Sequence, residues 1–228
     1  MRKCINLLLA ALLGAFTGCE PPKTTTLHDA VRAGDTTKVA QLLADSPQCA
    51  NAKDSLGDTA LSAAAQMGSL KIAELLLAHK ADANARANAG WTALHWAAYW
   101  NRREVAALLL RHGANPNVRN SLGFTPLHWA AYRGGKEVAE LLLAHKAEIN
   151  ATDCYGRTPL HHAAYWNRKE TAELLLAHNA NINAKAWADT WADGRFFQPL
   201  TPLDVALDHG ETATASLLRQ RGGIGGPP

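Results

Sequence analysis

Residues 125–131 read Thr-Pro-Leu-His-Trp-Ala-Ala, and the start of this stretch recurs along the chain. Related tetrapeptides begin at Thr59, Thr92 and Thr158, so four copies follow one another at a constant spacing. A triple leucine begins at the same offset after each of these threonines. Two further copies, at 25–28 and 201–204, lie slightly before and well after the places that this spacing predicts. A period of about 33 residues predicts stacked units that each contact only their neighbours.

Each unit reads as two short helices joined by a turn. The threonine is a preferred N-cap, and the proline that follows it in three copies suits the first helical position. The first helix is expected from Thr125 to about Arg133, where Gly134 can end it in a left-handed conformation. The second helix is expected over about 102–111, where apolar residues at i, i+3 and i+4 form one face to be buried.

Residues 120–152, from Asn-Ser-Leu-Gly-Phe-Thr-Pro-Leu-His-Trp-Ala-Ala onward, resemble an ankyrin repeat. The resemblance covers 25–222 and implies an all-α ankyrin-repeat solenoid of about six stacked helix-turn-helix repeats with finger turns. The expected repeats are 25–53, 54–86, 87–119, 120–152, 153–185 and 186–222, the last with an insertion at 186–199. The first and last depart most from the motif, as capping repeats with a solvent-facing side should. The glycine-rich tail 223–228 is expected to be flexible.

Ten histidines raise the question of a metal or catalytic site. Four of them share the motif position, where the resemblance implies bonds to backbone groups in the turns: His28, His95, His128 and His161. Four others form a series at the ends of the second helices, where a cation suits the helix dipole: His79, His112, His145 and His178. Repeats stack about 10 Å apart while Zn–N bonds are about 2 Å, so no two members of a series can share an ion. His162 departs from the repeat and is interpreted as incidental.

Composition and motifs argue against several classes of protein. With 47% hydrophobic and 19% charged residues, wholesale disorder is excluded. The formal charge is +3, and removal of Arg2 and Lys3 with the signal described next leaves +1, which does not support a nucleic-acid-coating protein. The sequence shows no His/Asp arrangement that would make Ser62 or Cys154 a nucleophile, and no phosphate loop or zinc spacing occurs. We therefore expect no enzymatic activity, no cofactor and no metal.

Residues 1–18 are typical of an export signal. A short positive start precedes a mostly apolar stretch at 5–16, which is too short to span a membrane and has the length of a signal core. Phe16-Thr17-Gly18-Cys19 resembles the lipobox of bacterial lipoproteins, in which the cysteine is lipidated and becomes the new N-terminus. Cys19 is then the expected lipid site, 19–24 the linker, and the cell envelope the expected location. The alternatives are a secreted, non-anchored effector or toxin-neutralising protein, an enzyme or ligand-processing domain and, if the signal is unused, an intracellular scaffold.

The expected function is binding of an unidentified partner protein by a monomer. The resemblance implies that the two residues after each Ala-Ala pair, together with the finger turns, line a concave groove. Tyrosine, tryptophan and arginine are enriched in interface hot spots, and the expected partner-binding residues are Trp91, Tyr99, Trp100, Phe124, Tyr132, Arg133, Tyr155, Arg157, Tyr165 and Trp166. Packing in the core is favoured for Trp96 and Trp129, whereas recognition is favoured for Trp100 and Trp166.

Three further features bear on binding and stability. The insertion at 186–199 is expected to grip a partner, close over the groove or cover the last repeat, through Trp187, Trp191, Phe196 and Phe197. A basic ledge is interpreted as a solvated face balanced by nearby glutamates, with an acidic partner or lipid head groups as alternatives: Arg102, Arg103, Arg133, Lys136, Arg168 and Lys169. Cys49 and Cys154 lie about three repeats apart, beyond the reach of a disulfide.

Overall fold

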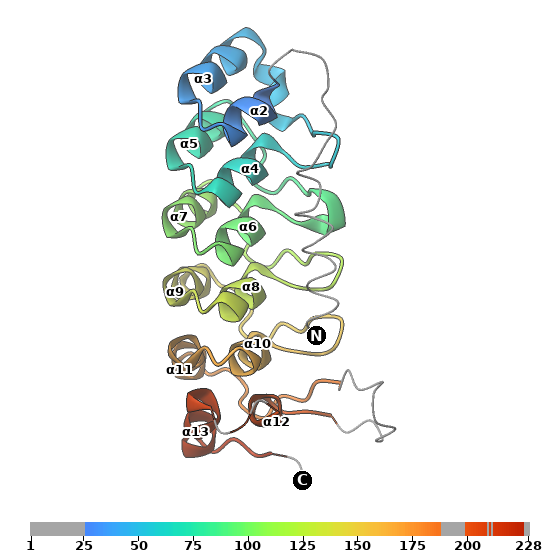
Figure 1. Ribbon diagram of the computed structural model, residues 1–228, viewed down its shortest axis with the longest axis vertical. Helices are drawn as coiled ribbons and strands as arrows, with labels where there is room; N and C mark the ends of the chain where they lie inside the picture. The colour runs from blue at the N-terminus through green and yellow to red at the C-terminus, as the bar shows by residue number, and fades with distance from the viewer. Residues whose placement is uncertain (1–25, 188–198, 209, 211, 226–228) are drawn as a thin grey trace.

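The structure, a computed structural model, describes residues 26–187, 199–208, 210 and 212–225. Six helix pairs stack in two columns in this part of the chain (Figure 1). The inner column consists of α2 (Leu27–Arg32), α4 (Ala60–Met67), α6 (Ala93–Tyr99), α8 (Pro126–Arg133), α10 (Pro159–Tyr165) and α12 (Pro202–Leu207). The outer column consists of α3 (Thr36–Asp45), α5 (Leu70–Ala78), α7 (Arg103–Arg111), α9 (Lys136–Ala144), α11 (Lys169–Ala177) and α13 (Ala213–Gln220). The predicted all-α ankyrin-repeat solenoid is confirmed.

The helix ends follow the predicted capping residues. Thr125 caps α8, and its hydroxyl and amide meet the ring of the motif histidine three residues later. Gly134 ends α8 with a left-handed φ of 76°, and Asn101 takes the same region after α6 with a φ of 52°. The cap of α2 is Thr26, one residue later than the alignment of the first repeat predicts.

The core is a thin layer shared between neighbouring repeats. Each inner helix packs on the inner helices before and after it and on the outer helix of its own repeat. The outer helices contribute one fully buried leucine each at the corresponding position: Leu43, Leu76, Leu109, Leu142, Leu175 and Leu218. Alanines such as Ala97 and Ala130 are fully buried on the inner helices, where small side chains let the helices approach closely.

An asparagine ladder, which the sequence analysis missed, joins the turns that follow the outer helices. Asn84 Nδ2 donates to the Gly113 carbonyl oxygen at 2.9 Å, and its Oδ1 accepts from the Asn115 amide at 2.7 Å. Asn117 makes the same two bonds to the following repeat. The asparagines recur at the period of the repeat, so the signal was present in the sequence: Asn51, Asn84, Asn117, Asn150 and Asn183.

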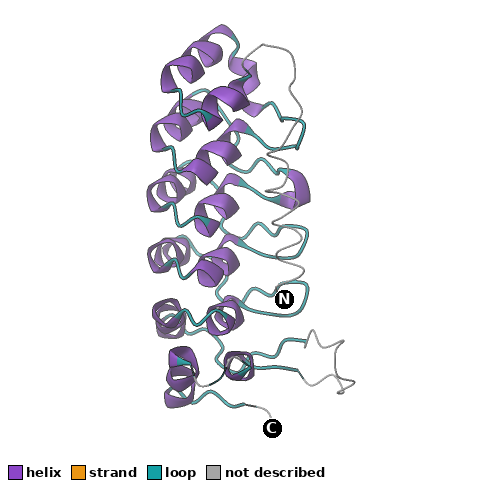
Figure 2. Cartoon of the chain, viewed as in Figure 1, coloured by secondary structure: helices purple, strands orange, loops and turns teal. Residues whose placement is uncertain are grey.

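The finger turns, one of which contains the short 3-10 helix η3 (Asn88–Gly90), are joined by a second ladder of backbone bonds. Three fingers each donate one backbone amide to a carbonyl oxygen of the finger before them: Ser121 to Ala89, Cys154 to Leu122, and Trp187 to Tyr155. The described residues form helices and loops with two isolated β-bridges and no strand (Figure 2).

The structure describes the start of the predicted last repeat at 186–187 and its end up to residue 225. Ala186 and Leu200 exchange backbone hydrogen bonds at 2.8 and 2.9 Å, which forms the base of the insertion, while Trp191, Phe196 and Phe197 lie outside the described residues. The described start of the predicted tail makes two hydrogen bonds to the last repeats. Ile224 donates its amide to Asn183 Oδ1 at 2.8 Å and accepts from Thr201 Oγ1 at 2.9 Å. The ladder residue Asn183 and the capping residue Thr201 thus both bind the backbone of Ile224.

Two further features of the described residues are the state of the cysteines and the character of the helices. Cys49 is half-buried, Cys154 is exposed, and no disulfide joins the two. Within the described ranges, no helix combines the length and the apolar character that a membrane crossing requires. The expected signal at 1–18, Cys19 and the linker at 19–24 lie outside the described residues.

Candidate functional site

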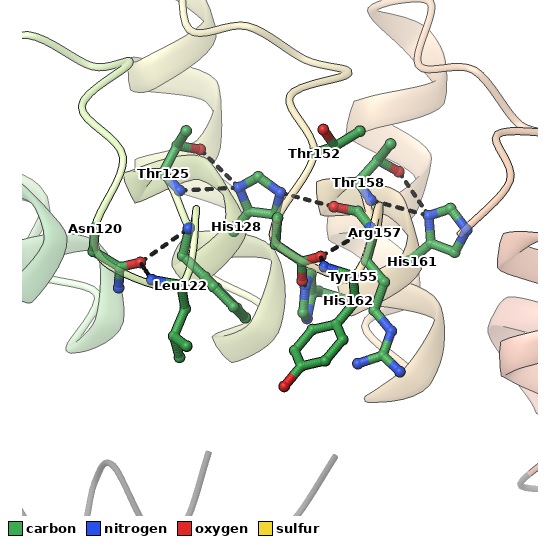
Figure 3. A network of polar contacts seen from close by, with 12 residues as sticks. Asn120, Leu122, Thr125, His128, Thr152, Tyr155, Arg157, Thr158, His161 and His162 are labelled. Carbon is green, nitrogen blue, oxygen red and sulfur yellow. Dashed lines mark hydrogen bonds and ion pairs between the residues drawn. The ribbon is translucent and has the colours of Figure 1, made fainter. Parts of the chain in front are cut away.

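The motif histidines form a buried polar network that runs from repeat to repeat (Figure 3). His128 Nδ1 faces the Thr125 amide at 3.0 Å, and its Nε2 faces the Arg157 carbonyl oxygen of the next finger at 3.1 Å. An amide can only donate and a carbonyl oxygen can only accept, so Nδ1 is unprotonated and Nε2 carries the hydrogen. His95 and His161 make the same pair of contacts. The structural role implied for these histidines is confirmed.

This geometry holds the rings in the neutral state. Burial lowers the pKa of His95 and of His161 to about 4. For His128, burial and then the nearby His162 lower the pKa to about 3. Protonation of Nδ1 would also place two donors face to face at the threonine amide. These histidines tie neighbouring repeats together and are unsuited to proton transfer near neutral pH.

A buried carboxylate–imidazole pair lies beside this network. His162 Nε2 donates to Asp153 Oδ2 at 2.9 Å, and both side chains have no exposed surface. Asp153 Oδ1 accepts the amides of Tyr155 and Arg157, which fixes the finger turn. Burial alone would raise the pKa of Asp153, but hydrogen bonding to His162 and its charge outweigh burial and hold that pKa below its ordinary value. His162 is therefore a structural partner, and its interpretation as incidental is wrong.

Aromatic rings form a continuous buried row across three repeats. Trp129 lies with its ring centroid 4.7 Å from both Trp91 and Phe124. Trp91 contacts Trp96 at 4.2 Å, and Phe124 contacts His162 at 4.9 Å. Each finger ring thus fills the space between the large rings of two neighbouring inner helices. The predicted core role of Trp96 and Trp129 is confirmed, since they are 3% and 1% exposed.

Several expected contact residues belong to this interior. The prediction that Trp91, Phe124 and Arg157 face a partner is wrong, because they are 1%, 2% and 5% exposed. Tyr99 and Tyr132 are also buried, since they stack on each other at 6.0 Å and pack edgewise on the ring of Trp129. These five residues support the surface from beneath and do not offer their side chains to a partner.

The residues that do reach the surface gather at the ends of three inner helices. Trp100 and Trp166 are half-buried at the C-caps of α6 and α10, and Tyr165 is half-buried beside Trp166. Arg133 is exposed, with its guanidinium carbon 5.0 Å from the centroid of the Tyr99 ring and 5.7 Å from that of Trp100. We call Trp100, Arg133, Tyr165 and Trp166 the aromatic strip. Its two halves are joined beneath the surface by the buried Tyr132, which packs on Trp166 at 4.8 Å and stacks on Tyr99 at 6.0 Å.

Two other expected contact residues lie on the fingers. Tyr155 is half-buried, with the Arg157 guanidinium carbon 5.1 Å from its ring centroid. Trp187, at the base of the insertion, is 62% exposed, the second most exposed of the large apolar side chains in the described residues. Both residues are at the finger side of the array, apart from the helix ends that carry the aromatic strip.

The repeat architecture has a direct counterpart among known families. The family model for ankyrin repeats, which spans three copies, matches residues 27–120 and 112–186.

The chain belongs to the ankyrin-repeat family.

The match covers the first five helix pairs of this ankyrin-repeat protein, and α12 with α13 continue the same geometry beyond it. A comparison with curated proteins finds no match. Ankyrin repeats generally mediate protein–protein interaction and are typically not enzymes. Among the described residues, no three histidine, cysteine, aspartate or glutamate side chains are grouped so as to hold a metal ion.

Proposed function

We propose that this ankyrin-repeat protein is an exported lipoprotein that binds a partner protein through the aromatic strip on its inner-helix face. The observation that carries the proposal is the strip itself. Trp100 and Trp166 occupy helix ends where a solvated position does not require tryptophan, and Arg133 lies over the rings of the neighbouring repeat. Rigid aromatic side chains beside arginine are typical of the residues that dominate binding energy.

The support beneath the strip favours recognition by a preformed surface. Tyr99 and Tyr132 hold the strip residues from below and are themselves fixed against Trp129. A surface that is already ordered loses little conformational entropy when a partner binds. Arg133 also has its side chain fixed over two rings, which lowers the entropy lost on contact.

The proposed anchor rests on the sequence of residues 1–19. A positive start, a short apolar stretch and Thr17-Gly18-Cys19 favour lipidation of Cys19 over simple cleavage. Several acyl chains hold a protein at a membrane far longer than one does. A linker of residues 19–24 would keep the first repeat within roughly 20 Å of the bilayer. The partner is then an envelope protein.

The double variant Trp100→Ala/Trp166→Ala is expected to bind the partner on the order of 100-fold more weakly, because two hot-spot contacts are removed. The partner is obtained by crosslinking to the mature protein in its own envelope, and affinity is then measured with both purified proteins. Because both side chains also pack on tyrosines, we expect a stability loss of about 1–2 kcal/mol for each change.

The matched control is Met67→Ala, which removes a 50%-exposed side chain from the same helix-end position in the second repeat. It should leave partner binding unchanged. Partner binding at wild-type affinity by a folded double variant would disprove the role of the strip.

Lipidation of Cys19 is tested by labelling cells with a radioactive fatty acid. The natural chain should carry the label and sediment with membranes, whereas Cys19→Ser should lose both the label and the membrane association. A natural chain that is released unlabelled into the medium would instead support the secreted, non-anchored alternative.

A further inference from the structure

The C-terminal ends of α4, α6 and α8 each meet an arginine that comes from the following repeat. Arg102 Nε donates to the Gln66 carbonyl oxygen at the end of α4, at 3.4 Å. Arg168 Nε makes the equivalent bond to the Tyr132 carbonyl oxygen at the end of α8, at 3.2 Å. Arg133 lies over the rings of Tyr99 and Trp100 at the end of α6. One guanidinium thus lies over each of three successive helix ends.

The sequence arranges this row through an alternation between repeats. Residues 97–102 and 163–168 are identical, both reading Ala-Ala-Tyr-Trp-Asn-Arg, whereas 130–135 read Ala-Ala-Tyr-Arg-Gly-Gly. Gly68 and Gly134 make room for the arginines, because a Cβ at either position would lie 2.8 Å from the Cδ of Arg102 or of Arg168. The alternation therefore brings cations from two different sequence positions to the same place in successive repeats.

The outer donors of these three guanidinium groups have no protein acceptor in the described chain. Arg102 and Arg168 each use only Nε, and Arg133 makes ring contacts alone. Other arginines of the array use their outer donors within the protein. Arg86 and Arg119 each donate an Nη2 hydrogen bond to a backbone carbonyl of the next repeat. A guanidinium has five N–H donors, and its two Nη groups form a fork that fits a carboxylate.

Within the described residues, the nearby glutamates form no ion pair with the arginines of the row. The basic ledge was interpreted from the sequence as a face balanced by Glu104, Glu137 and Glu170. In the described residues, the ion pair that the ledge makes is Lys169 with Glu173 at 3.7 Å, and the three arginines of the row pair with no carboxylate. The row is therefore a set of open cationic sites beside the aromatic strip.

We propose that this row binds an extended acidic segment of the partner protein. The inference rests on the proposed function, since the row borders the aromatic strip and specifies that the bound segment of the partner is acidic. Packed helices lie about 8–10 Å apart, and an extended chain in the polyproline II conformation has three residues per turn and rises about 3.1 Å per residue, so every third side chain lies on the same face. Carboxylates three residues apart would therefore face successive guanidinium groups. A mature charge of only +1 favours local recognition of such a segment over general attraction to nucleic acid.

The first test uses a labelled, end-capped peptide, Glu-Ser-Thr-Glu-Ser-Thr-Glu, and measures its binding to the mature protein by fluorescence anisotropy at low salt. The control peptide has the same composition with its three glutamates adjacent. We expect the spaced peptide to bind at least threefold more tightly, because only it can reach all three arginines. Equal affinity for the two peptides, or tighter binding of a thymidine oligonucleotide, would overturn the proposal.

The second test compares two charge changes of the same size. Arg133→Gln should weaken binding of the spaced peptide about fivefold, whereas Arg103→Gln, an exposed residue in the first turn of α7, should weaken it less than twofold. Equal losses would show a general charge effect and contradict the row. If partner binding is unchanged in Arg133→Gln but abolished in the double variant Trp100→Ala/Trp166→Ala, the proposed function stands and this inference is wrong.

Discussion

Acidification from about pH 7 to about pH 4 is expected to reduce the free energy of unfolding by several kcal/mol. The folded pKa is about 4 for His95 and His161 and about 3 for His128, against an ordinary value of 6.5. Between these values the unfolded chain binds protons that the folded chain does not. Stability is therefore complete above about pH 6.5 and is lost as the pH falls through the folded pKa values. One pKa unit corresponds to about 1.4 kcal/mol, so each ring accounts for on the order of 3 kcal/mol.

Urea denaturation at a series of pH values measures this loss. The control is His128→Ser, because the second repeat already carries Ser62 at the motif position, where its hydroxyl oxygen lies 3.0 Å from that of Thr59. The variant should be less stable at neutral pH, and its further loss on acidification should be smaller by roughly a third. A free energy of unfolding that stays constant down to about pH 4 would contradict the neutral-ring assignment.

Trp129→Ala is expected to lower the free energy of unfolding by about 3–5 kcal/mol, the usual range for a fully buried large aromatic side chain. The ring of Trp129 lies at the centre of the buried row and contacts Trp91, Phe124, Tyr99 and Tyr132. In an array each repeat is stabilised by its interfaces, so weakening of this junction should also split one unfolding transition into two. Circular dichroism during urea denaturation reports both effects.

Trp187→Ala is the matched control, since it removes the same side chain from a 62%-exposed position. It should change the free energy of unfolding by less than about 1 kcal/mol. A loss below about 1 kcal/mol for Trp129→Ala, with one sharp transition, would mean that the aromatic row does not join the repeats.

The fold was predictable because each local signal agreed with the period. Threonine caps, glycine or asparagine at the helix ends, and one apolar face per outer helix recur at the same offsets, so helix bounds follow within a residue or two. The asparagine ladder had the same spacing, but the sequence alone does not show that an amide side chain at Asn84 reaches two backbone groups of the next repeat.

The surface was harder to predict because a side chain's direction depends on its neighbour's size. Trp91 and Phe124 turn inward to fill the space beside Trp96 and Trp129, whereas the repeat with Ala63 carries Asp58 at the corresponding finger position. This co-occurrence of large finger and helix residues was visible in the sequence. It indicates packing, and exposure of a finger aromatic is expected only where the helix residue is small.

The contact between Asp153 and His162 likewise could not be predicted from the sequence. In that repeat the helix position carries histidine in place of tryptophan, and the finger carries aspartate where the preceding repeat has Asn120. Each substitution alone reads as a polar departure from the motif. Only their contact at 2.9 Å shows that they compensate each other inside the core.

The position of Ile224 has a consequence for self-assembly. Every junction in a solenoid is head-to-tail, so the bare end of one molecule resembles the surface on which the first repeat of another could stack. Contacts of this kind do not close and can propagate into filaments. Ile224 already occupies the oxygen of Asn183 that an added repeat would use. A further repeat stacked on this end would therefore have to displace Ile224 from Asn183 before it could extend the asparagine ladder.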